Sequence, residues 1–166
     1  MDTRDLFPHE ILQDAIGKSC AKSEFSIKML VILSFLGGGY VGFGYLACLR
    51  VISGIPAEWN GLAALLGASV FPIALICILI GGGELATGNM MIMALGRLTG
   101  RVSTHKLVRN WLIVSLGNLA GAVAMAYFLG HYVGLAEGPA TAKTIAIAEA
   151  KVNMDFGRAL VSAIAC

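Results

Sequence analysis

The sequence predicts an all-α integral membrane protein, and three observations support this prediction. Hydrophobic residues make up 57% of the 166 residues and charged residues only 13%, whereas soluble domains are usually about 25% charged. Three long apolar stretches are each sufficient to cross a bilayer. Glycine occurs 21 times, which is typical of membrane helices that pack closely or break. The same composition excludes a soluble globular domain and a disordered chain.

The first two stretches predict two membrane spans of different kinds. An uncharged run of 21 residues at 29–49 predicts a helix over about 29–52. The second stretch covers 36 residues, 61–96, with Glu84 as its only charge. As one straight helix it would measure roughly 54 Å, against a hydrocarbon core of about 30 Å. Glycines and small polar residues gather around Glu84, so we expect a single crossing that breaks near 81–89.

The remaining segments complete the expected organisation. A third span is predicted over about 107–133, and a fourth begins at 156–166 with 11 residues, too few to cross a membrane. We therefore expect a fragment of a longer protein, with a cytoplasmic N-terminus over 1–28 and a partial transporter domain over 29–166. Within the N-terminal part, apolar residues at helical spacing after Pro8 predict a short amphipathic helix on the membrane surface, with a frayed polar tail as the alternative.

Basic residues flank the expected spans unequally. The connection 97–109 contains four Lys or Arg residues and no acid, whereas 53–60 contains no basic residue. Because Lys and Arg are enriched in cytoplasmic loops, we expect 97–109 and the N-terminus on the cytoplasmic side of the inner (plasma) membrane.

The expected break contains the groups with functional chemistry. Irregular backbone persists in a membrane only where protein buries it or where it lines a cavity. The half-helix that starts near Thr87 would present its N-terminus to an anion. Glu84 is a candidate functional group by its position, but we favour a loop-stabilising role in which its carboxylate accepts the loop's own N–H groups. Thr87 and Asn89 are expected to contact a passing solute, to cap the half-helix, or both. Asn89 is assigned with Glu84 to stabilising the loop.

Other patterns in the spans have structural interpretations. Phe71 and Leu75 share one helix face, where they would form an apolar collar or ordinary packing, and Pro72 predicts a kink between them. Close helix packing is expected at two GxxxG pairs, Gly38 with Gly42 and Gly117 with Gly121.

The sequence offers no chemistry for an enzyme. It has no nucleophile–base pair, phosphate-binding loop or nucleotide motif, and its three histidines lie at or beyond the span ends. The four cysteines lack metal-ligand spacing. The net charge of +2 gives no case for a nucleic-acid partner. We therefore expect no enzymatic activity, no cofactor and no metal.

Two sequence blocks resemble a known family of transporters. GGGELATGNMMIMALGRLTGRVS at 81–103 and NWLIVSLGNLAGA at 110–122 resemble the broken second helix and the third helix of the formate/nitrite transporter family. Residues 7–22 and 150–166 are similar to its surface helix and to the start of its fourth helix. The resemblance implies a homopentamer in the bilayer whose protomers have an aquaporin-like bundle of two inverted three-helix repeats. Each protomer has its own pore for small monovalent anions such as formate or nitrite.

The resemblance also implies roles for residues of the loop. Thr87 matches a threonine that hydrogen-bonds toward a central histidine, which in the family belongs to the fifth helix. Leu85 and Ala86 match residues that narrow the cytoplasmic side of the pore. Some formate channels have Phe at the position of Ala86, so the cytoplasmic slit is expected to be wider here or gated differently.

Three further positions match the family's anion pathway. Phe71 and Leu75 match apolar constriction residues of the second helix. Lys151 matches an outer lysine whose charge draws the anion in and favours its protonation.

Three functions remain open at this point. The leading hypothesis is proton-linked transport of small monovalent anions, with residues 1–166 inactive alone. An aquaporin-like channel for neutral solutes is the second, although the sequence lacks the NPA turns usual in such channels. A non-transporting, truncated remnant is the third.

Overall fold

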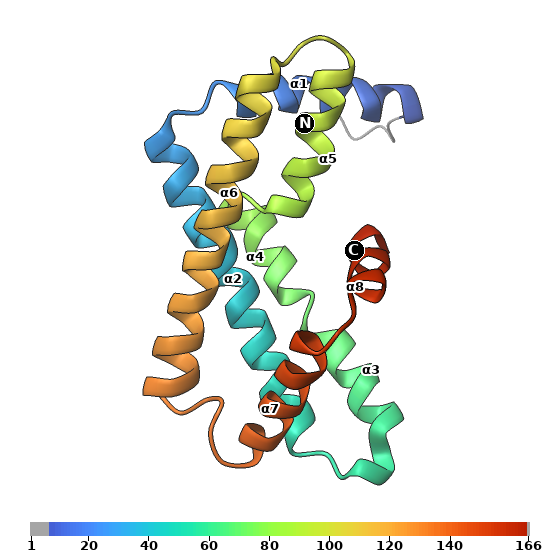
Figure 1. Ribbon diagram of the computed structural model, residues 1–166, viewed down its shortest axis with the longest axis vertical. Helices are drawn as coiled ribbons and strands as arrows, with labels where there is room; N and C mark the ends of the chain where they lie inside the picture. Colours follow the sequence, from blue (N-terminus) through green and yellow to red (C-terminus); the bar gives the residue numbers. More distant parts are fainter. Residues whose placement is uncertain (1–6, 166) are drawn as a thin grey trace.

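The computed structural model describes residues 7–165, whose regular elements are all helices (Figure 1). Three helical segments are long and apolar enough to cross a membrane: α2 (Ile27–Ser53), Ala57–Gly81 and Thr104–Tyr132. The first and third segments overlap the spans expected at 29–52 and 107–133, and the second covers the part of the expected 61–96 crossing that precedes the break. The all-helical membrane fold predicted from composition is therefore confirmed for the described part of the chain.

The second crossing is divided into consecutive helices. A 3₁₀ turn, η1 (Ala57–Trp59), leads into α3 (Asn60–Val70), and α4 (Ile73–Gly81) follows after a kink. The kink lies where Pro72 was expected to produce one, because proline lacks the N–H group that would continue the helix. After an interruption, the chain resumes as α5 (Ala86–Leu98).

The interruption occupies residues 82–85, inside the expected range. Gly82 adopts a φ of 76°, and the N–H groups of Gly82 and Gly83 both donate to the carbonyl of Ile78, which ends α4. This left-handed backbone conformation is one that glycine adopts far more readily than other residues. Leu85 is extended and precedes the first residue of α5, so the second half-helix begins one residue before Thr87.

The spans α2 and α6 (Thr104–Met125) pack with their backbones in contact. A Cβ atom added to Gly38 would collide with the main chain of Asn118, and one added to Gly121 would collide with the carbonyl of Phe35. The close packing expected at the GxxxG pairs is therefore confirmed. Beyond α6 the helix widens into a π-helical segment, η2 (Ala126–Tyr132).

Helix α1 (Pro8–Ser23) lies across one end of the bundle, where it packs against α5 and α6 (Figure 1). Pro8 is its first residue, as expected. At its other end, Nη2 of Arg109 on α6 donates to the carbonyls of Ser23 and Phe25 at 2.8 and 3.1 Å. These bonds fix the surface helix to the spanning helix.

The segment after η2 contains a helix that was not predicted. No helix was expected between the third span, which was to end near residue 133, and the fourth at 156, but α7 (Pro139–Val152) forms there and packs against α2. The expected fourth span appears as the short helix α8 (Phe156–Ala165).

Candidate functional site

A buried ion pair lies at the interruption of the second crossing. Glu84 is 5% exposed. Its Oε1 atom accepts a hydrogen bond from Nζ of Lys22 at 2.5 Å, and its Oε2 atom accepts one from Nδ2 of Asn89 at 2.6 Å. The carboxylate therefore bonds to side chains of α1 and α5. The expectation that it accepts the loop's own N–H groups is wrong, because the donors that reach the carboxylate are the side chains of Lys22 and Asn89.

The hydrogen bonds continue from this ion pair into α6. Lys22 also donates to Oδ1 of Asn89 at 3.1 Å, and Nδ2 of Asn89 donates to Oδ1 of Asn110 at 3.0 Å. Asn89 and Asn110 are 2% and 0% exposed. We call Lys22, Glu84, Asn89 and Asn110 the buried polar cluster. It joins α1, the interruption, α5 and α6 in one connected network.

Neither Thr87 nor Asn89 caps α5. The N-cap residue is Leu85, and no side chain accepts a hydrogen bond there. Thr87 and Asn89 are the second and fourth residues of α5, and Asn89 lies within the buried polar cluster. The cap interpretation was wrong because α5 begins before both residues.

The main chain of the interruption is held by the two spanning helices. The N–H group of Glu84 donates to the carbonyl of Leu33 at 2.9 Å, and the N–H group of Ala86 donates to Oδ1 of Asn118 at 2.8 Å. Nδ2 of Asn118 donates to the carbonyls of Glu84 and Ser34 at 2.8 and 2.7 Å. These contacts satisfy backbone groups that would otherwise be costly in a membrane.

Part of the first turn of α5 is exposed rather than packed against α2 and α6. Leu85 and Ala86 are half-buried, whereas Thr87 and Gly88 are exposed. A helix leaves its first N–H groups without acceptors in its own backbone, and Asn118 binds that of Ala86. The N–H groups that follow, at Thr87 and Gly88, therefore form an accessible helix N-terminus with a partial positive charge.

The other predicted pathway residues are more widely distributed. Phe71 lies at the kink and is 37% exposed, with its ring edge-on to Tyr45 at a centroid distance of 6.4 Å. Leu75 on α4 is 47% exposed. Lys151 lies in the last turn of α7, exposed, and has no ion-pair partner among residues 7–165. Because these side chains are exposed, they do not close a constriction within the described chain.

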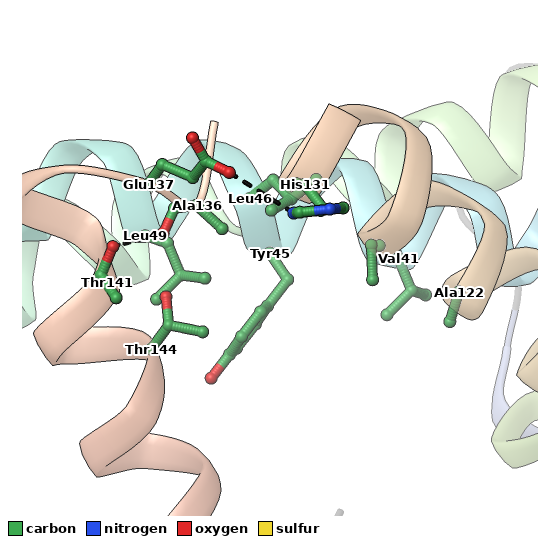
Figure 2. A pocket seen from close by; sticks show the side chains of 13 residues that line it. Val41, Tyr45, Leu46, Leu49, Ala122, His131, Ala136, Glu137, Thr141 and Thr144 are labelled. Carbon is green, nitrogen blue, oxygen red and sulfur yellow. Dashed lines mark hydrogen bonds and ion pairs between the residues drawn. The ribbon is translucent and has the colours of Figure 1, made fainter. Parts of the chain in front are cut away.

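An apolar cavity of about 620 Å³ lies elsewhere, between α2, the end of α6 with η2, and the start of α7. Figure 2 shows Tyr45, Thr141 and Thr144 at this cavity, with Glu137 directed toward His131. Nδ1 of His131 is 3.4 Å from Oε1 of Glu137. None of the residues predicted for the anion pathway lines this cavity.

Comparison with known proteins agrees with the sequence resemblance. The chain is 46% identical over 160 residues to an uncharacterized transporter, YrhG, of Bacillus subtilis, covering 96% of this chain and 60% of the relative. It is 37% identical over 159 residues to the formate channel BtFdhC of Bacillus thuringiensis, covering 96% of this chain and 61% of that channel. The chain thus spans about three fifths of the length of these curated relatives. Such relatives are transporters and channels, not enzymes.

A solved structure and a family model complete the comparison. The structure of an FNT family ion channel matches with a TM-score of 0.69 at 25% identity, covering 76% of this chain and 50% of the channel. This match supports a membrane protein with the helical fold of these channels. The family model described as formate/nitrite transporter matches residues 9–166. The chain therefore belongs to the formate/nitrite transporter family.

Proposed function

We propose that the complete protein transports small monovalent anions of the formate or nitrite type through a pore in each protomer. The observation that carries this proposal is the accessible first turn of α5 at Thr87 and Gly88, between apolar spans. The partial positive charge of a helix N-terminus stabilises an anion. Broken helices form substrate sites in this way in several transporter folds. The relative named as a formate channel supports the choice of anion.

Transport is proposed to be linked to a proton. The ammonium of Lys151 raises the local concentration of the anion at the outer mouth. Phe71 and Leu75 then disfavour a bare charge, because an apolar constriction provides no replacement for its hydration shell. The anion bound at the first turn of α5 takes up one proton from the outer solution and crosses as the neutral acid, which releases that proton into the cytoplasmic solution. Leu85 and Ala86 border the path on the cytoplasmic side.

The described helices are proposed to form the first of two inverted repeats in an aquaporin-like protomer. Leu79 and Ile80 lie directly before the interruption and are 82% and 83% exposed, which supports a second repeat that covers this face. Five such protomers form the pentamer in the inner membrane. The basic connection 97–109 supports a cytoplasmic location for the N-terminus.

Substitution of the pathway residues tests the proposed mechanism. In proteoliposomes with the complete protein, we expect Thr87→Ala to reduce formate flux about tenfold, because a hydrogen bond to a charged group contributes about 1.5–3 kcal/mol. Lys151→Ala is expected to reduce flux most at low formate concentration. Thr87→Ser and Lys143→Ala, the latter on the same helix as Lys151, serve as controls that retain flux. Equal flux in all four variants would contradict these assignments.

A second test concerns the repeat itself. Residues 1–166 reconstituted alone are expected to give no formate or nitrite flux, because the open first turn of α5 has no facing repeat to enclose a path. Anion flux from residues 1–166 would contradict this prediction. Rapid swelling of vesicles of the complete protein in glycerol, without anion flux, would instead contradict the proposed substrate class.

A further inference from the structure

A second, polar cavity of about 520 Å³ lies at the connection between α5 and α6. Three basic side chains line it, Arg97, Arg101 and Lys106, and no acidic residue does. Arg97 is the twelfth residue of α5, which places it roughly 16 Å along the helix from the interruption. This cavity is therefore separate from the proposed anion path.

Two of these three cations have no carboxylate partner within residues 7–165. Nζ of Lys106 forms an ion pair with Oε1 of Glu24 at 2.5 Å, and this contact holds the pKa of the Glu24 carboxyl below its usual range. Arg97 and Arg101 have no ion-pair partner among residues 7–165. Nε of Arg97 donates to the hydroxyl oxygen of Thr104 at 2.8 Å, and both residues line the cavity.

The position of the cavity indicates contact with the membrane surface. Helix α1, with the amphipathic sequence expected of a surface helix, packs against α5 and α6 at this end of the bundle (Figure 1). Leu98, next to Arg97, is 84% exposed. An exposed leucine beside arginines at the end of a spanning segment is typical of the boundary between acyl chains and headgroups.

We infer that this cavity binds the phosphate group of an anionic phospholipid in the leaflet on the α1 side. Arginine binds phosphate through paired N–H groups, which gives geometric specificity as well as charge. Basic pockets at the ends of membrane helices recognise lipid headgroups in this way. This inference does not rest on the proposed transport function.

Native mass spectrometry of the complete, detergent-solubilised protein tests the inference. Phosphatidylglycerol, phosphatidylcholine and sodium phosphate are added separately, and the bound molecules are counted. We expect tighter binding of phosphatidylglycerol than of phosphatidylcholine, and about a tenfold loss of that preference in an Arg97→Gln/Arg101→Gln double variant. Lys18→Gln/Lys28→Gln is the matched control, because it removes two exposed charges near the same end of the bundle.

Further variants distinguish a specific phospholipid site from general attraction by positive charge. An Arg97→Lys/Arg101→Lys variant is expected to recover part of the preference, because the charge remains while the paired N–H groups are lost. Unchanged lipid preference in the double glutamine variant would overturn the inference. Equal loss in the Lys18→Gln/Lys28→Gln control would also overturn it, because the lipid preference would then arise from net charge alone. Saturation by sodium phosphate without any lipid preference would contradict a phospholipid ligand.

Discussion

Replacing Lys22 with methionine is expected to destabilise the protein by about 3–5 kcal/mol, because it leaves the Glu84 carboxylate buried without its cation. The Lys22 side chain is 22% exposed and that of Glu84 is 6% exposed, so little water replaces the lost partner. The same change removes the side-chain hydrogen bonds from α1 to Glu84 and Asn89. The unfolding free energy, measured by detergent titration of the complete protein in mixed micelles, checks this prediction.

Two further variants distinguish the loss of the Lys22–Glu84 ion pair from the loss of packing by the Lys22 side chain. Lys18→Met, on the exposed side of the same helix, is expected to change stability little, because exposed ion pairs contribute about 0–1 kcal/mol. The double variant Lys22→Met/Glu84→Gln removes both charges and is expected to recover part of the stability. A Lys22→Met protein as stable as the Lys18→Met protein would show that the ion pair does not hold the loop.

Replacing Gly121 with alanine is expected to destabilise the protein by about 1–3 kcal/mol or more, because the added methyl group collides with backbone atoms of α2. Its Cβ would meet the carbonyl of Phe35 and lie 2.7 Å from the amide nitrogen of Gly39. Backbone atoms cannot rotate away as a flexible side chain can. The two spanning helices would have to separate, which would also move Asn118 from the interruption.

Gly17→Ala provides the matched control for this substitution. Gly17 lies within α1, and an added Cβ would meet nothing within 4 Å. The helix gains about 0.5–1 kcal/mol from such a change, because glycine loses more conformational freedom than alanine on folding. Thermal unfolding midpoints in detergent should therefore move in opposite directions for the two variants. A shift of the same sign and size would contradict the backbone-contact explanation.

The interruption of the second crossing was predictable because its signals are local. A 36-residue stretch exceeds the membrane thickness, and the glycines with Glu84 mark the only position where it can break. The partners of Glu84 were not predictable in this way. Lys22 lies 62 residues earlier in the chain, and no periodicity connects the two. Only the cost of a buried carboxylate indicated that a cation must lie nearby.

Two other features were missed for different reasons. Asn118 appeared as one polar residue in an apolar run, a signal that a polar group in a membrane needs a partner, but it did not identify the loop backbone as that partner. Helix α7 was not predicted, because its alanine-rich sequence is too short to cross a bilayer and so carries no signal of a membrane span. The pathway roles of Phe71, Leu75 and Lys151 stay predictions, because these exposed side chains need the rest of the protein to define a pore.

Accessibility at Thr87 during transport tests most directly whether the anion passes the first turn of α5. In a variant of the complete protein with its native cysteines replaced by alanine, Thr87→Cys is treated with a water-soluble thiol reagent in proteoliposomes. Leu116→Cys, at an exposed apolar position of α6, is the control. We expect reaction at position 87 to abolish formate flux and formate to slow that reaction, while the control keeps its flux. Full flux after complete modification at position 87 would contradict a path beside Thr87.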